Sequence, residues 1–193
     1  MAEFVRLCVI AGSTRPGRRS PEVARWVATR AAASGAFTVR VVDLGELGLP
    51  LFDEPEHPRH RRYVHAHTRE WSAVVEASDA FVIVTPEYNH GYPSGLKNAL
   101  DFLYDEWRDK AVGLVCFGGV SAGLRAVQQL KTVLLELRMH PVHEGVAIPF
   151  HIEHFDTEGH FQPTDRFEGA LSSMLAAVQQ EESRLSAVRA SGK

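Results

Sequence analysis

The stretch VIAGSTRPGRRSPE, residues 9–22, contains the end of an apolar strand, a turn and the start of a helix. The turn combines Gly12 with hydroxyl side chains, and it holds three arginines within five positions. Backbone amides at a helix start and a nearby guanidinium are groups that bind phosphate in proteins. We therefore interpret this turn as the binding site for the phosphate of a nucleotide.

The rest of the chain alternates β-branched apolar runs with stretches of helical period. The predicted strands are 5–11, 37–42, 80–85, 111–117 and 142–148, and the predicted helices are 21–33, 63–77, 94–103, 121–139 and 165–188. Strands joined by helical crossovers form a parallel sheet with helices on both faces. The sequence predicts one doubly wound α/β domain over residues 1–193, with two long irregular stretches at 43–62 and 149–164.

Composition excludes several classes of protein. The chain of 193 residues is 45% hydrophobic and 23% charged, as is usual for a globular protein, and no apolar run approaches the roughly 20 residues of a membrane helix. Its start lacks the pattern of a secretory leader, so we expect a cytoplasmic protein. Cys8 and Cys116 fall in different predicted strands, which favours a core role over redox chemistry. A net charge of -3 with scattered arginines disfavours nucleic-acid binding.

Ligands of such sheets bind beyond the carboxyl ends of the strands, where three loops are rich in polar groups. The first loop, residues 12–20, offers the Ser13, Thr14 and Ser20 hydroxyls, the Arg15 guanidinium and the amides of the following helix. Together these groups suit a terminal phosphate, although a solvated arginine-rich turn is the alternative.

Two other phosphate motifs fail in the first loop. Gly12 and Gly17 have the spacing of a P-loop, but Arg18 and Arg19 stand where Lys and Ser/Thr should follow, so the magnesium ligand is missing. A dinucleotide fingerprint fails as well, because no second glycine follows Gly12 before Gly17.

The second loop, residues 85–101, reads TPEYNHGYPSGLKNALD. Prolines stiffen it, and flat side chains alternate with polar ones: Glu87, Tyr88, Asn89, His90 and Tyr92. We expect it to accept a planar heteroaromatic ring, with a rigid connector as the alternative. In the helix that follows, Lys97 and Asp101 are spaced to form an ion pair, which we expect at the surface or at an interface.

The third loop, CFGGVSAG at residues 116–123, has two adjacent glycines. Gly118 and Gly119 let backbone amides approach a ligand closely and donate to its carbonyl edge. A simple strand-to-helix turn explains this motif equally well.

The combination of GSTRPGRRS, PEYNHGYPSGLKNALDFL and FGG, in this order, resembles the NADPH-dependent FMN reductase family of flavodoxin-like proteins, which includes quinone, azo-dye and chromate reductases. The resemblance covers Val5 to about Gly159. It implies a flavodoxin-like five-stranded sheet whose FMN phosphate is bound by Ser13, Arg15 and Ser20. It also implies that the isoalloxazine is lined by Pro86, Glu87, Tyr88 and Asn89, with Gly118 at its pyrimidine end. Whether Arg18 or Arg19 shares the phosphate stays open.

The resemblance further implies an FMN-dependent oxidoreductase that takes a hydride from NADPH or NADH and reduces a small acceptor such as a quinone, an azo dye or free flavin. The cofactor performs this chemistry, so we predict no catalytic side chain, ping-pong kinetics, and stabilisation of reduced flavin by amides around Gly118 and Gly119. A homodimer or homotetramer is also implied. The alternatives are a flavodoxin-like electron carrier or flavin sensor without turnover and, more distantly, a P-loop hydrolase.

The remaining features predict no further site. Histidines crowd residues 57–67 and 151–160, but on a helix His65 and His67 would point to different faces, and no cysteine completes a metal site. The tail, residues 179–193, alternates charge like an exposed helix. Three large side chains fit either core or surface: Trp71, Leu103 and Trp107.

Overall fold

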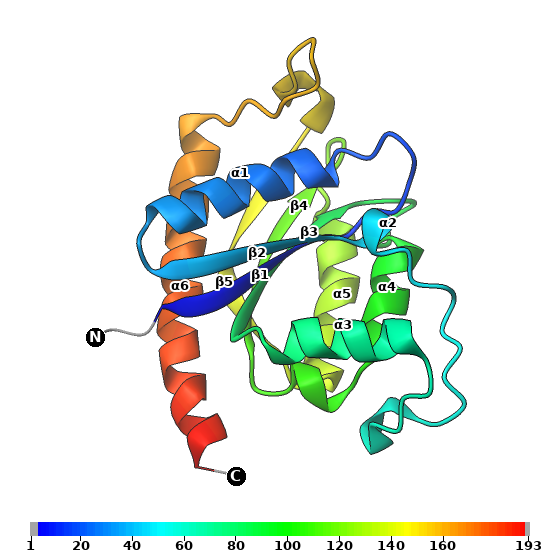
Figure 1. Ribbon diagram of the computed structural model, residues 1–193. Coiled ribbons are helices and arrows are strands. Elements are labelled where there is room, and N and C mark those ends of the chain that lie inside the picture. The colour runs from blue at the N-terminus through cyan, green and yellow to red at the C-terminus, as the bar shows by residue number, and fades with distance from the viewer. Residues whose placement is uncertain (1–3, 192–193) are drawn as a thin grey trace.

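A computed structural model describes residues 4–191, whose strands form one five-stranded, all-parallel sheet (Figure 1). The strands are β1 (Val5–Ala11), β2 (Phe37–Asp43), β3 (Ala80–Pro86), β4 (Ala111–Phe117) and β5 (His140–Ile148). They lie in the order β2-β1-β3-β4-β5, which is the flavodoxin-like order. The predicted fold class is confirmed.

Helices cover both faces of the sheet, with α1 and α6 on one face and α3, α4 and α5 on the other (Figure 1). The helices are α1 (Ser20–Ala33), α2 (Leu44–Leu47), α3 (Ala66–Glu76), α4 (Ser94–Asp101), α5 (Leu124–Glu136) and α6 (Asp165–Ala190), and the 3-10 turns are η1 (Pro58–His60), η2 (Asp105–Trp107) and η3 (His151–His154). No helix within residues 4–191 is long and apolar enough to cross a membrane.

The residues of β1 show how one strand supplies two cores. Leu7 and Val9 join the core beneath α1 and α6, whereas Cys8 and Ile10 join the core beneath α3, α4 and α5. Successive side chains of a strand point to opposite faces. A sheet that is buried on both sides therefore needs a nearly continuous apolar strand, which is the pattern that made β1 predictable.

The helix predicted over 121–139 is shorter in the structure for a local reason. Ala122 and Gly123 have φ values of 53° and 86°, which lie outside the helical region. As a result α5 begins at Leu124. Arg138, with φ of 58°, leaves the helical region in the same way beyond the other end of α5.

The helix predicted from residue 63 begins later, at Ala66. His65 precedes it in an extended conformation, and the Glu54 carboxylate accepts the amides of Val64 and His65 at 2.8 and 3.1 Å. Because His65 is not helical, the prediction that His65 and His67 point to different faces is wrong. Their rings stack, with centroids 5.1 Å apart and an interplanar angle of 6°.

The tail predicted as exposed, residues 179–193, is partly buried, which corrects that expectation. Glu182 and Leu185 of α6 are only 4% and 5% exposed. Glu182 forms an ion pair with Arg189, which lies seven residues, or about two turns, further along the helix. Alternating charge in this segment therefore does not mean that every residue is exposed, because Glu182 and Leu185 face the protein interior. Residues 192–193 lie outside the described part of the chain.

The side chains that fitted either core or surface all belong to the core: Trp71 and Trp107 are fully buried, and Leu103 is nearly so. Cys8 and Cys116 are buried free thiols, as predicted. Burial raises the pKa of each thiol to about 12, so neither is a reactive thiolate at neutral pH.

Candidate functional site

The first loop is fixed at the carboxyl edge of the sheet by its glycine. The Gly12 N–H donates to the carbonyl oxygen of Val84 in β3 at 2.9 Å, and a Cβ on Gly12 would lie 3.1 Å from that oxygen and 3.2 Å from Leu96 Cδ2. Glycine therefore permits this close approach of β1 to β3 and α4. Ser13 and Ser20 are fully buried beside it, and the Ser13 N–H donates to Ser20 Oγ at 3.3 Å.

The first loop presents several unused hydrogen-bond donors. Among residues 4–191, the amides of Thr14, Gly17 and Ser20 have no acceptor. Ser20 opens α1, where the helix dipole favours negative charge. Arg15 is exposed, and its guanidinium has no partner within the described residues. This combination of free amides, buried hydroxyls and an available cation fits a phosphate group.

The other two arginines of the first loop have partners within the fold. Arg18 forms hydrogen bonds of 2.7 to 3.2 Å to the Asp43 carboxylate at the end of β2. The Arg19 guanidinium lies 4.9 Å from the centre of the Phe155 ring, a cation–π contact. Of the three arginines, Arg15 is thus the one whose guanidinium has no side-chain partner among the described residues.

The second loop folds back as a tight hairpin. Tyr88 and Gly91 exchange two backbone hydrogen bonds of 2.8 and 2.9 Å. Between them Asn89 and His90 have φ values of 50° and 68°, as a type I′ turn requires, and both are exposed. The Tyr88 hydroxyl lies 2.8 Å from Ser13 Oγ, which joins the second loop to the first.

Glu87 joins the second loop to the third. Pro86 ends β3 as a buried residue, and the carboxylate of Glu87 accepts hydrogen bonds from Ser121 Oγ at 2.9 Å, the Arg125 amide at 3.1 Å and Arg125 Nη1 at 3.2 Å. Burial opposes ionisation of this carboxyl, but the hydrogen bonds outweigh burial and lower its pKa. The contact of Glu87 with an isoalloxazine ring stays a prediction. Its hydrogen bonds to Ser121 and Arg125 show that it connects the second loop to the third.

The two glycines of the third loop differ in what they offer. The Gly118 N–H donates to the Ile148 carbonyl at 3.2 Å, so the fold already uses this amide. The Gly119 N–H has no acceptor among residues 4–191, and a Cβ on Gly119 would meet nothing within 4 Å. The amide available to a ligand is therefore that of Gly119.

All of the predicted site residues lie in these three loops, and contacts between side chains connect the loops to one another. The residues are Ser13, Arg15, Ser20, Pro86, Glu87, Tyr88, Asn89, Gly118 and Gly119. The role of each residue toward a ligand stays a prediction, but the edge has both a donor set for a phosphate and half-buried or exposed side chains for a flat ring.

Sequence reasoning missed the segment that follows β5. The Phe150 N–H donates to the Gly119 carbonyl at 3.1 Å, and both the backbone N–H and the ring Nδ1 of His151 contact the Gly118 carbonyl, at 3.1 and 2.9 Å. The only signal in the sequence was the unusual length of the irregular stretch 149–164. No motif identified the two residues that contact the third loop.

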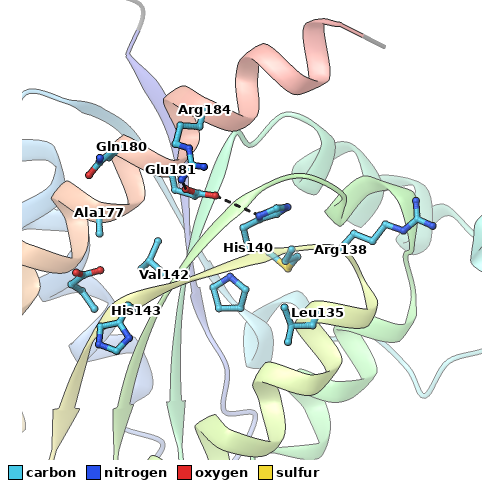
Figure 2. Close-up of a pocket in the computed structure, with 12 residues that line it drawn as sticks. Leu135, Arg138, His140, Val142, His143, Ala177, Gln180, Glu181 and Arg184 are labelled. Carbon is cyan, nitrogen blue, oxygen red and sulfur yellow. Dashed lines mark hydrogen bonds and ion pairs between the residues drawn. The ribbon is translucent and has the colours of Figure 1, made fainter. Parts of the chain in front are cut away.

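A cavity of about 610 Å³ lies elsewhere, between α5, the first half of β5 and α6 (Figure 2). Its charged side chains have mixed signs: Arg184 Nη1 lies 3.1 Å from Glu181 Oε2, and His140 Nδ1 lies 3.5 Å from Glu181 Oε1. No Phe, Tyr or Trp lines it. This cavity lies at the opposite end of β5 from the three loops and contains none of the predicted site residues.

The crowded histidines near residue 65 have a carboxylate partner. His67 Nε2 lies 3.0 Å from Asp53 Oδ1, and His65 Nε2 lies 3.9 Å from Asp53 Oδ2. Within residues 4–191, no group of three His, Cys, Asp or Glu side chains is arranged to hold a metal ion.

Comparisons with known proteins agree with this site. The family described as NADPH-dependent FMN reductase matches residues 5–153. An NAD(P)H-dependent FMN reductase of Schizosaccharomyces pombe is 38% identical over 148 residues, which are 75% of this chain and 74% of that protein. One of Saccharomyces cerevisiae is 37% identical over 155 residues, with 75% and 80% covered.

A solved structure shows the same fold. It is that of FerB, a flavoenzyme NAD(P)H:(acceptor) oxidoreductase from Paracoccus denitrificans, and the TM-score is 0.74 at 20% identity, with 92% of this chain and 99% of FerB covered. Together with the family match, the chain's own loops lead to one conclusion. The chain belongs to the NADPH-dependent FMN reductase family.

Proposed function

We propose that this FMN-dependent NAD(P)H oxidoreductase holds the FMN phosphate in the first loop and the isoalloxazine between the second and third loops. The observation that supports this placement most strongly is the donor set of the first loop, which comprises the Arg15 guanidinium, unpaired among the described residues, and free amides beside the buried hydroxyls of Ser13 and Ser20. The 2.8 Å contact between Ser13 and Tyr88 puts this donor set next to the aromatic second loop.

The chain's own groups bind and orient the cofactor. Bound FMN supplies the hydride and electron transfer, so no side-chain acid or base is required. The Gly119 amide is free to donate to the pyrimidine edge, where reduced flavin carries negative charge, and a preoriented donor stabilises such charge. Pro86, Tyr88 and Asn89 would line the ring.

One ring-shaped site serves both substrates in this proposal. NADPH or NADH and a flat acceptor, such as a quinone, an azo dye or free flavin, would bind in turn, which gives ping-pong kinetics. Initial rates of NADPH oxidation, measured at several quinone concentrations, should give parallel double-reciprocal lines. Intersecting lines would contradict a shared site. Flavin binding without any turnover would support an electron carrier or sensor instead.

We further propose a homodimer or homotetramer that uses the surface of α4 and α5. A groove of about 550 Å³ runs along both helices and is lined by Phe52, Tyr104 and Val133. Phe52 is 40% exposed, and Leu51, its neighbour in the chain, is 84% exposed. The predicted pair Lys97–Asp101 forms on α4 at 2.5 Å. Burial of the exposed apolar side chains Leu51 and Phe52 between subunits would drive association.

Sedimentation should therefore show an assembly that dissociates in Phe52→Asp. Phe4→Asp is the matched control, because Phe4 is also an exposed phenylalanine, at 58%, but does not line this groove. A monomeric wild-type protein, or equal dissociation of both variants, would contradict the proposal.

A cytoplasmic location and a single domain over residues 1–193 complete the proposal. Two free thiols suit a reducing compartment, and one sheet includes all five strands. Cell fractionation tests the location, and limited proteolysis that yields no stable smaller fragment tests the domain organisation.

A further inference from the structure

His151 holds one peptide group of the third loop from two sides. Its backbone N–H donates to the Gly118 carbonyl oxygen at 3.1 Å, and its ring Nδ1 lies 2.9 Å from the same oxygen. A carbonyl oxygen only accepts hydrogen bonds, so Nδ1 must bear the hydrogen. The ring itself is half-buried against Phe117, with centroids 5.2 Å apart.

The held carbonyl belongs to the same peptide group as the free amide. The Gly118 C=O and the Gly119 N–H form one planar unit, and in a trans peptide they point in opposite directions; no cis peptide bond occurs within residues 4–191. Two adjacent glycines would otherwise let this peptide rotate easily. By fixing the oxygen, His151 fixes the direction of the unused Gly119 N–H.

The neighbouring bonds strengthen this arrangement. The Gly118 N–H donates to Ile148, and the Gly119 carbonyl accepts from Phe150 at 3.1 Å. Phe150 has φ of 45°, a left-handed conformation that is strained for a side chain of this size. In this conformation the amides of Phe150 and His151, which are consecutive residues, both donate to the third loop. The segment after β5 therefore acts as a support for that peptide.

We propose that His151 is a positioning residue that keeps the Gly119 N–H directed at the pyrimidine edge of the flavin and thereby favours binding of reduced over oxidised FMN. The inference rests on the proposed FMN site. Reduced flavin carries the negative charge that a preoriented N–H stabilises, whereas the oxidised ring gains less. Two donors on the Gly118 oxygen also polarise the peptide and make its N–H a stronger donor.

The test compares three variants at two histidines. His151→Ala removes the ring donor, whereas His151→Asn restores an N–H close to the position of Nδ1. His154→Ala is the matched control, because His154 lies in the same turn η3 but packs its ring on Phe167, 4.9 Å away. Circular dichroism and thermal unfolding verify that each variant is folded. The measurements are the Kd for oxidised FMN and the midpoint potential of the bound flavin.

We expect His151→Ala to lose about tenfold more affinity for reduced than for oxidised FMN, which lowers the two-electron midpoint potential by about 30 mV. His151→Asn should recover most of this change, and His154→Ala should match the wild type. If the wild type binds FMN but the potential of His151→Ala is unchanged, or if His151→Asn shifts as far as His151→Ala, the positioning role is wrong. If the wild type binds no FMN, the proposed site itself is wrong.

Discussion

Replacing Arg15 with alanine should weaken FMN binding while leaving the fold intact. The Arg15 side chain is exposed, and its guanidinium has no partner within residues 4–191. Its loss therefore removes no side-chain interaction within the described part of the chain, and the free energy of unfolding should change by less than about 0.5 kcal/mol. The effect on FMN binding then reports the contact with the phosphate alone.

The expected magnitude follows from the kind of contact. A hydrogen bond to a charged group contributes about 1.5 to 3 kcal/mol, and each 1.4 kcal/mol is a tenfold change in Kd. The Kd for FMN should rise by about tenfold to about 150-fold. Riboflavin lacks the phosphate, so its Kd should stay the same in the wild type and in Arg15→Ala.

Arg18→Ala provides the contrast within the same loop. It removes the hydrogen bonds to Asp43, and the two side chains are only 21% and 9% exposed. This variant should lower the free energy of unfolding by about 1 to 3 kcal/mol. Fluorescence titration with FMN and with riboflavin, together with urea unfolding, separates the two effects. An unchanged Kd for FMN in Arg15→Ala, or an equal loss of riboflavin binding, would refute the assignment.

Three further predictions test the surrounding structure. Tyr88→Phe removes the hydroxyl that lies 2.8 Å from Ser13 Oγ and should lower the free energy of unfolding by about 1 kcal/mol; no change in urea unfolding would argue against this contact. Burial lowers the pKa of Lys110 to about 8, so above pH 8 and below its unfolded pKa the unfolded chain binds a proton that the folded chain lacks. The wild type should therefore gain stability relative to Lys110→Met as the pH rises from 8 to 9.5, and a difference that does not vary with pH would contradict this. Cys8 and Cys116 should resist a disulfide reagent at pH 8 until the protein is unfolded in guanidinium; rapid reaction of either native thiol would show that the strands open.

The placement of the site was predictable from the sequence because it depends on local patterns and on one rule of topology. Continuous apolar runs fixed the bounds of β1 and β4, which agree with the structure at both ends. The carboxyl ends of parallel strands meet at one edge, so loops far apart in the sequence were expected to converge. The contacts Ser13–Tyr88 and Glu87–Ser121 confirm that they do.

The directions of individual groups were not predictable, because they depend on partners far away in the chain. Gly118 and Gly119 are equivalent in the sequence, yet a bond from the Gly118 amide to Ile148 at the end of β5 leaves only the Gly119 amide free. Arg15 and Arg18 likewise differ only because Asp43, 25 residues beyond Arg18, pairs with one of them. Helical periodicity likewise predicts a helix at His65, but the Glu54 carboxylate accepts the His65 amide and holds the backbone extended there.

Binding of FMN itself tests whether the three loops form one cofactor site. Purified protein is saturated with FMN, passed over a desalting column and examined by visible absorption, and NADPH is then added without oxygen. We expect stoichiometric flavin to elute with the protein and NADPH to bleach the flavin absorption. Elution of the protein without flavin would contradict the claim that the three loops form an FMN site.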